Sequence, residues 1–215
     1  MSIQQDARFW DRLARKYAAD KIADEAGYER TLARTKTYLK PTDAVLEFGC
    51  GTGTTALRLA PFTGTMVASD ISSEMIAIAN EKRSAESALA GRLAFVRATL
   101  EQLDYPEGAF DVVLGFNAVH LMHDVNDCLW RVRRLVKPGG LFISKTPCLG
   151  DMSPFIRAAI PVMQLFGKAP KVSTFTARQL EATIVAAGFE IVEIARHGTK
   201  GKDTRPFIVA RRPAG

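Results

Sequence analysis

A short stretch with three glycines and an acidic residue is the part of the sequence best suited to chemistry. It reads EFGCGTG over residues 47–53, and the next apolar run ends at Asp70. Glycine loses the most backbone freedom on folding, so its density here indicates a turn that approaches a ligand closely. A carboxylate at Glu47, just before the turn, suits a cationic ligand rather than a pyrophosphate. Because Asp70 is placed to accept hydrogen bonds from two hydroxyls of a ribose, the pair predicts a site for a nucleoside that carries an amino acid.

The glycine spacing separates the possible ligand classes. Gly49, Gly51 and Gly53 form a G-x-G-x-G pattern, whereas dinucleotide-binding turns use G-x-G-x-x-G, whose third glycine is replaced here by Thr54. No Gly-Lys-Ser/Thr sequence follows, which excludes a P-loop. Thr54 and Glu47 together therefore disfavour a nicotinamide-dependent oxidoreductase.

Strands that alternate with helices are expected to position this turn. Short apolar runs typical of buried strands lie at 44–48, 65–70, 93–98, 110–116 and 141–146. Helical spacing of apolar residues lies at 54–60, 72–87, 127–136 and 176–187, and two more strands are expected from Phe189 and over 205–212. Crossover helices of this length imply a largely parallel sheet covered on both faces, which is an α/β fold.

Two segments outside this alternation are expected to cover the site. Residues 1–40 contain two expected helices, at 5–24 and 28–39, which form an N-terminal helical cap. Residues 151–175 form an insertion that is too apolar for a solvated loop. Its large apolar side chains are Phe155, Ile156, Ile160, Val162, Met163 and Phe166. The insertion suits a lid over a pocket for a hydrophobic ligand, and equally a core helix or a dimer contact.

Five motifs in order identify a family. They are VLEFGCGTG, VASDIS, FDVVLGFNAVHLMHD, RRLVKPGGLFIS and AGFEIVEI. Together they resemble the class I S-adenosylmethionine-dependent methyltransferases of the small-molecule kind, methyltransferase types 11 and 25, over residues 9–212. The resemblance implies one domain over 1–215, with a Rossmann-like sheet of seven mostly parallel strands whose last strand is antiparallel. It also implies an enzyme that uses S-adenosyl-L-methionine and releases S-adenosyl-L-homocysteine.

The resemblance further implies cofactor-binding positions. Glu47 and the glycine turn would surround the methionine end of the cofactor, and Asp70 would hold its ribose. Ile71 and Met75 would pack near the adenine, and Phe116 would offer its backbone near the amino group. The complete set is Tyr17, Glu47, Gly49, Cys50, Gly51, Gly53, Asp70, Ile71, Met75, Thr99, Leu100 and Phe116.

Some of these positions have a purely structural alternative. Tyr17 and Met75 also belong to apolar helix faces, and Phe116 also ends an apolar strand. Thr99 stands where the family usually has an acid that accepts from the adenine amino group, and a neutral hydroxyl accepts about half as strongly. The amide of Leu100 can still pair with the ring, so the departure predicts weaker adenine recognition rather than loss of binding.

Two histidines are the candidate catalytic residues. Methyl transfer is an in-line displacement in which the protein aligns the reactants and excludes water, and a general base adds only about 10²- to 10⁴-fold. His120 and His123 follow the fourth strand, at the mouth of the sheet, and can deprotonate a hydroxyl, thiol or amine near neutral pH. The alternative is that His120 packs under the loop and His123 is merely exposed.

Composition narrows the partners. The excess of 29 Lys and Arg over 23 Asp and Glu is scattered, so no nucleic acid is expected. Cys50, Cys128 and Cys148 lack the spacing of metal ligands, so no metal site is expected. No apolar run reaches the roughly 18 to 20 residues that cross a bilayer. The expectation is a cytoplasmic monomer or homodimer that methylates a small acceptor, lipophilic or amphipathic. An RNA or protein methyltransferase and a non-catalytic S-adenosylmethionine-binding protein remain the alternatives.

Overall fold

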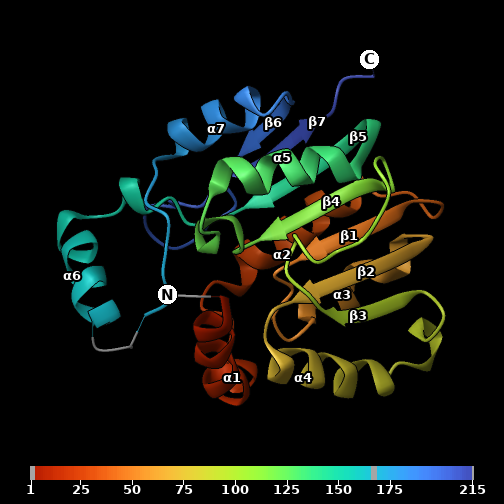
Figure 1. The fold of residues 1–215 in the computed structure, drawn as a ribbon, viewed down its shortest axis with the longest axis horizontal. Coiled ribbons are helices and arrows are strands. Elements are labelled where there is room, and N and C mark those ends of the chain that lie inside the picture. The colour runs from red at the N-terminus through yellow and green to blue at the C-terminus, as the bar shows by residue number, and fades with distance from the viewer. Residues whose placement is uncertain (1–2, 166–168, 215) are drawn as a thin grey trace.

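A single sheet organises the computed structural model, which describes residues 3–165 and 169–214 (Figure 1). Its strands are β1 (Ala44–Phe48), β2 (Thr65–Asp70), β3 (Leu93–Arg97), β4 (Phe110–Phe116), β5 (Val136–Lys145), β6 (Glu190–Ala195) and β7 (Phe207–Arg211). The strand order is β3-β2-β1-β4-β5-β7-β6, and β7 is antiparallel to both of its neighbours. The α/β fold, the seven strands and the antiparallel last strand are confirmed for the described residues.

The fifth strand begins earlier than the sequence predicts. The expected strand was 141–146, but β5 starts at Val136, which pairs with Phe110 before the register shifts. The backbone amide of Gly139 donates to the Arg212 carbonyl at 2.8 Å, so this Pro-Gly-Gly segment is held against the chain that follows β7. The prediction that a helix ends here is correct, because α5 ends at Leu135. The residues that follow form a bulged strand instead of a turn.

Helices cover both faces of the sheet. They are α1 (Ile3–Ala19), α2 (Glu25–Lys36), α3 (Thr54–Leu59), α4 (Ser73–Ser84), α5 (Val125–Leu135), α6 (Pro154–Leu165) and α7 (Ala177–Ala186). Short 3-10 turns lie at Ala60–Phe62, Ser87–Leu89, Val119–Leu121 and Leu149–Asp151. The Asp24 side chain accepts from the Gly27 amide and caps the start of α2. The first expected helix, 5–24, therefore ends earlier than predicted, at Ala19, and the second, 28–39, begins earlier, at Glu25.

Side-chain alternation along the central strands gives the core two halves. Leu46 and Phe142 belong to the half under α5 and α7, while Val45 and Leu114 belong to the half under α2, α3 and α4. Neighbouring residues of β1 therefore face opposite sides, and both sides are buried. Since Glu47 shares a face with Val45, its carboxyl group is carried into the interior beneath α2 and α3.

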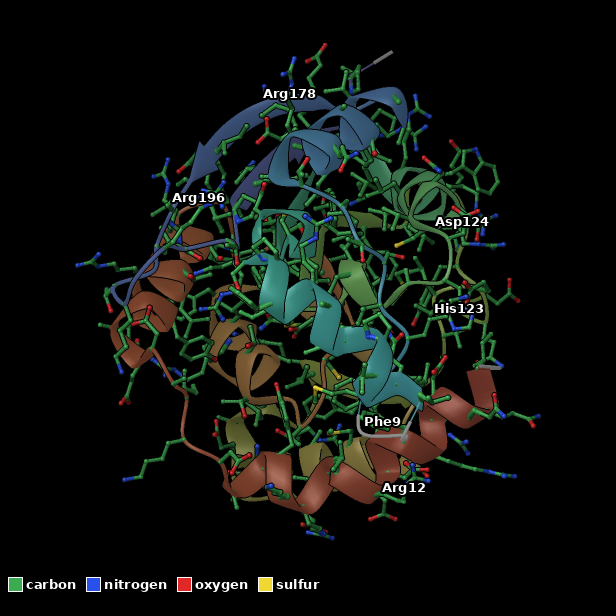
Figure 2. All side chains as sticks on the ribbon, turned by 90° about the vertical axis from the view of Figure 1, so that its left-hand side faces the viewer. Phe9, Arg12, His123, Asp124, Arg178 and Arg196 are labelled. Carbon is green, nitrogen blue, oxygen red and sulfur yellow. The ribbon has the colours of Figure 1, made fainter. Side chains whose placement is uncertain are left out.

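Helix α6 stands apart from both halves of the core. None of its described residues is buried, and the side chains of Phe155 and Leu165 are 87% and 83% exposed. Figures 1 and 2 show it as a separate helix, which lies at the front of the view in Figure 2. The alternative of a core helix is therefore wrong, whereas the lid and the dimer contact stay predictions. Phe166 lies outside the described residues. No helix in the described ranges has the length and apolar character that would let it cross a bilayer.

Candidate functional site

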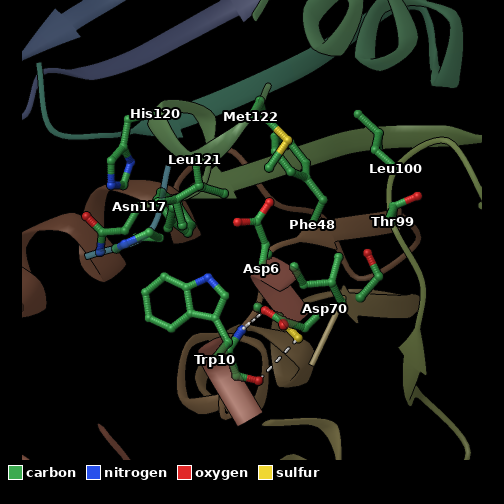
Figure 3. Close-up of a pocket in the computed structure, with 18 of the residues that line it drawn as sticks. Asp6, Trp10, Phe48, Asp70, Thr99, Leu100, Asn117, His120, Leu121 and Met122 are labelled. Atoms are coloured by element: carbon green, nitrogen blue, oxygen red, sulfur yellow. Dashed lines mark hydrogen bonds between the residues drawn. The ribbon is translucent and has the colours of Figure 1, made fainter. Parts of the chain in front are cut away.

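A cavity of about 530 Å³ opens at the carboxyl ends of β1 and β4 (Figure 3). These strands are neighbours although β2 and β3 come between them in the sequence, so the chain order reverses here. Ligands of open α/β sheets bind at such a reversal, and the cavity volume lies in the range of small-molecule sites, about 300 to 1,000 Å³. Of the fourteen predicted site residues, all but Gly53 line this cavity. The thirteen are Tyr17, Glu47, Gly49, Cys50, Gly51, Asp70, Ile71, Met75, Thr99, Leu100, Phe116, His120 and His123.

The three glycines of the turn have different physical roles. Their φ angles are 65° at Gly49, 54° at Gly51 and 74° at Gly53, a region that side chains rarely adopt. A Cβ on Gly51 would meet only Tyr17, at 3.8 Å, so the backbone here is open to the cavity. A Cβ on Gly53 would lie 2.5 Å from the Phe95 ring, and Gly53 does not line the cavity. Gly53 therefore lets α3 pack on the sheet, while Gly51 gives a ligand access to the backbone.

Asp70 is held in place by the backbone around it. Its Oδ2 accepts from the Gly51 amide and its Oδ1 accepts from the Ser72 amide, each at 2.9 Å. Partial burial raises the pKa of this carboxyl group, and the two amide hydrogen bonds oppose that rise. Each oxygen keeps a further lone pair, so the rigid carboxylate can still accept from two ligand hydroxyls.

Glu47 is the most deeply buried acid of the site. Its side chain is 2% exposed, and Oε2 has no hydrogen-bond partner among the described residues. Burial, followed by the charge of Asp70, raises the pKa of Glu47 to about 8. Burying a carboxyl group without a partner costs free energy. A cationic ligand bound beside Glu47 would offset that cost. This orphaned oxygen, beside the open backbone of Gly51 and the fixed carboxylate of Asp70, fits the ammonium and ribose of S-adenosylmethionine.

The two histidines differ in their surroundings. His120 Nδ1 lies 2.9 Å from the Thr146 hydroxyl, and burial lowers the pKa of His120 to about 4. It is therefore neutral near pH 7 and a weak base, better suited to hydrogen bonding than to proton abstraction. His123 Nε2 lies 2.6 Å from Asp6 Oδ2. The alternative that His123 is merely exposed is not what the geometry shows, because its ring is tied to an acid from α1.

Other predicted residues line the cavity and also serve the fold. Met75 belongs to a small apolar cluster with Ala14 and Ile78 that joins α1 to α4. The Thr99 hydroxyl accepts from the Gln102 amide at 3.3 Å, which leaves it able to donate to a ligand. Met75 therefore packs α1 on α4 and also lines the cavity, and its contact with the adenine stays a prediction.

The structure adds residues that the sequence analysis did not identify. Asp6 and Trp10 reach the cavity from α1, and Glu101, Asn117 and Lys171 reach it from loops. Asn117 has a φ of 52°, the one left-handed residue other than glycine within the described ranges. Backbone strain of this kind gathers at functional sites. The sequence could have indicated Glu101, because it is an acid two positions after Thr99. For the polar residues of α1 the sequence offered only an amphipathic pattern, which does not predict a place in the site.

A family model described as methyltransferase domain matches residues 45–140, which include all but the first residue of β1, the strands β2 to β4, the glycine turn and Asp70. This match and the relatives named next support a class I methyltransferase. A sterol 24-C-methyltransferase of Pneumocystis carinii is 23% identical over 190 residues, 84% of this chain and 50% of that protein. The ubiquinone/menaquinone biosynthesis C-methyltransferase UbiE of Ectopseudomonas mendocina is 33% identical over 141 residues, 62% of this chain and 54% of that protein.

Solved structures agree with the class I methyltransferase fold. The YcgJ protein from Bacillus subtilis superposes with a TM-score of 0.70 at 16% identity, covering 87% of this chain and all of that one (100%). At this identity the similarity concerns the fold. The chain also spans only about half the length of the two curated relatives named above, 50% and 54%.

Proposed function

We propose that the protein transfers a methyl group from S-adenosylmethionine to a small acceptor, lipophilic or amphipathic. The observation that carries this proposal is the partnerless Oε2 of Glu47, buried beside a backbone-held Asp70 and an open glycine turn. A cationic amino acid joined to a nucleoside satisfies all three features at once, whereas a nicotinamide dinucleotide would place phosphate next to two acids.

Each part of the cofactor has residues suited to hold it. Glu47 would accept from its ammonium, Asp70 from its ribose hydroxyls, and the Gly49–Gly51 backbone would lie against its amino-acid portion. Ile71 and Met75 line the wall near Thr99 and Leu100, where the adenine would pack. When bound, the cofactor supplies a methyl group already activated on a sulfonium. The chain then needs only to align the acceptor with it and to exclude water, and alignment alone lowers a barrier by about 7 to 11 kcal/mol.

The acceptor side of the cavity is mainly apolar. Its apolar lining includes Ile3, Trp10, Leu121, Met122 and Pro170. Such a lining suits a hydrophobic body with few polar groups. The names of the two relatives, a sterol methyltransferase and an enzyme of ubiquinone and menaquinone biosynthesis, support a lipophilic acceptor here as well.

The binding experiment compares the wild type with Asp70→Ala. Calorimetry and thermal unfolding should show that S-adenosylmethionine and S-adenosylhomocysteine bind and raise the Tm. Asp70→Ala should weaken both by at least tenfold, because it removes the acceptor of the ribose hydroxyls. The matched control is Asp104→Ala, which removes an exposed acid that does not line the cavity. Binding of a nicotinamide dinucleotide with no response to either methionine nucleoside would overturn the proposal, and binding without turnover of any acceptor would indicate a non-catalytic protein.

The proposal also assigns helix α6 the role of a lid over the cavity. The chain on either side of it reaches the cavity through Pro147, Pro170 and Lys171, although no residue of α6 lines the cavity. Closure over an apolar acceptor would give Phe155 and Leu165 the burial that they lack in this structure. The remaining features of the proposal are one domain over 1–215, a cytoplasmic location, and a monomer or homodimer that binds no nucleic acid.

The lid is tested by Phe155→Ser combined with Leu165→Ser. The double variant should keep its unfolding free energy within about 0.5 kcal/mol, because both side chains are exposed, and should bind S-adenosylhomocysteine as the wild type does. Its KM for lipophilic acceptors found by screening should rise several-fold, while its elution volume in size-exclusion chromatography stays unchanged. A shift from dimer to monomer would assign α6 to a dimer contact and contradict the lid.

A further inference from the structure

Asp6 places a second carboxylate with an unpartnered oxygen in the wall of the cavity. Its side chain is 11% exposed, and Oδ1 has no hydrogen-bond partner among the described residues. Figure 3 shows the carboxylate in the middle of the cavity, between the Trp10 ring and the side chains of Phe48 and Met122. The family match begins at residue 45, so Asp6 lies outside the part of the chain that the family defines.

A hydrogen bond from a distant loop fixes this carboxylate. His123 Nε2 lies 2.6 Å from Asp6 Oδ2, and His123 follows the 3-10 turn Val119–Leu121 after β4. A carboxylate can only accept, so Nε2 carries the proton that joins the two groups. Figure 2 shows His123 close to the beginning of α1, where Asp6 is situated. Since Oδ2 is occupied by His123, Oδ1 is the oxygen left for a ligand.

The surroundings indicate what kind of ligand group Oδ1 would accept from. A buried oxygen that lacks its partner costs about 1 to 3 kcal/mol, and the nearby wall of Trp10, Leu121 and Met122 offers no donor side chain except the indole N–H. Two other acids of the cavity, Glu47 and Asp70, are already assigned to the cofactor. The missing partner is therefore a hydrogen-bond donor carried by an otherwise apolar molecule.

We propose that Asp6, positioned by His123, binds the nucleophilic hydroxyl or neutral amine of the acceptor and takes its proton during methyl transfer. This inference rests on the proposed function and names the acceptor class. The acceptor's oxygen or nitrogen forms the new bond to the methyl carbon, the carbon–sulfur bond of the donor breaks, and its electron pair stays on sulfur. The acceptor's proton passes to Asp6 Oδ1. The positive charge of the sulfonium and the negative charge of Asp6 disappear together, so the transfer creates no new charge in the buried site.

The proposal separates this chain from the carbon methylation named for its two relatives. An oxygen or nitrogen nucleophile bears a proton that hydrogen-bonds to Asp6 before the reaction, so the carboxylate would contribute to binding as well as to the transfer. His123 is a positioning residue, because it acts through Asp6. Binding of an acceptor analogue, measured without turnover, therefore tests the proposal directly.

The experiment uses the protein saturated with S-adenosylhomocysteine and three probes of one shape: 2-naphthol, 2-naphthylamine and 2-methylnaphthalene. Binding is followed by calorimetry and by the fluorescence of Trp10, with Trp10→Phe as the optical control. The wild type should bind 2-naphthol or 2-naphthylamine at least tenfold more tightly than 2-methylnaphthalene, and the stronger of the two identifies a hydroxyl or an amine acceptor. Asp6→Asn should reduce the preference to about threefold or less, and Asp6→Leu should abolish it.

Controls distinguish a specific role from a folding defect. All variants should bind S-adenosylhomocysteine as the wild type does, and the exposed-site variant Asp104→Asn should keep the probe preference. His123→Ala should lower the preference, whereas His123→Gln, which retains a donor for Oδ2, should restore much of it. An equal preference in the wild type and Asp6→Leu would overturn the inference while leaving the proposed function intact. Failure of S-adenosylhomocysteine to bind would instead refute the proposed function.

Discussion

Glu47→Gln is expected to stabilise the ligand-free protein and, at the same time, to weaken its binding of S-adenosylmethionine. The carboxyl group of Glu47 is buried without a partner, and its pKa is raised to about 8. The unfolded chain ionises this group near its ordinary pKa of about 4.3, while the folded protein keeps it protonated until about pH 8. Stability is therefore fully present below the lower value and is lost as the pH rises through the higher one.

The size of the effect follows from this difference in pKa. Each unit corresponds to about 1.4 kcal/mol, so the folded wild type gives up roughly 3 kcal/mol by pH 7 and more by pH 8. Glutamine cannot ionise, and its buried amide offsets part of the gain. Denaturant unfolding without ligand should show Glu47→Gln more stable by about 2 to 4 kcal/mol at pH 8, with a difference that shrinks toward pH 5. An unchanged difference across this range would contradict the assignment of the raised pKa.

Binding should respond in the opposite direction. A cationic ligand favours the charged carboxylate, so the wild type should release close to one proton per bound S-adenosylmethionine at pH 7, measured by calorimetry in buffers of different ionisation enthalpy. Glu47→Gln should release none and bind at least tenfold more weakly. The exposed control Asp104→Asn should change neither quantity. Equal proton release by the wild type and the variant would show that Glu47 does not face the cation.

The second large effect is expected from alanine at two glycines of the same turn. Gly53→Ala places a Cβ 2.5 Å from Phe95 at a φ of 74°. The left-handed backbone costs about 1 to 2 kcal/mol for alanine, and overpacking costs typically 1 to 3 kcal/mol more. Gly53→Ala should therefore lower the free energy of unfolding by about 2 to 5 kcal/mol, as measured by urea denaturation of the ligand-free protein.

Gly51→Ala is the matched comparison. Its φ is 54°, but the nearest atom to an added Cβ is Tyr17 Cε1 at 3.8 Å, so it carries the backbone cost without the clash. It should lose only about 1 to 2 kcal/mol of stability, yet should weaken S-adenosylhomocysteine binding more than Gly53→Ala does, because the new methyl group enters the cavity. A larger stability loss at Gly51 than at Gly53 would contradict the division of roles within the turn.

Much of the fold could be predicted because it depends on patterns local in sequence. The runs 44–48, 65–70 and 110–116 became β1, β2 and β4 with the same bounds, since continuous apolar segments in a parallel sheet are buried on both faces. The helix predicted from 176 starts with a capping box of Thr176 and Gln179. The sequence did not predict the early start of β5, because the Pro-Gly-Gly segment signals a turn. There the strand bulges, Val136 pairs with Phe110 of β4, and Gly139 and Gly140 hydrogen-bond to Arg212, just after β7.

The cofactor half of the site was also predictable, since its residues belong to one motif or follow a strand end. Glu47, Gly51 and Asp70 meet because the carboxyl ends of neighbouring parallel strands share an edge. The acceptor half of the site could not be predicted from the sequence. Asp6 and His123 are 117 positions apart, and nothing in the sequence relates a polar residue of the first helix to a loop after the fourth strand. Only the docking of α1 across the sheet edge brings the two together.

The sequence alone determined the order of strands and helices, the glycine turn and the two acids beside it, because these are set by apolar periodicity and by residue types at fixed spacing. The tertiary structure decided which glycine packs and which faces the ligand, which carboxyl groups are left without partners, and that α6 stays outside the core. Those properties depend on burial and on distances between segments far apart in the chain, and burial is what gives a carboxylate its raised pKa and its need for a ligand.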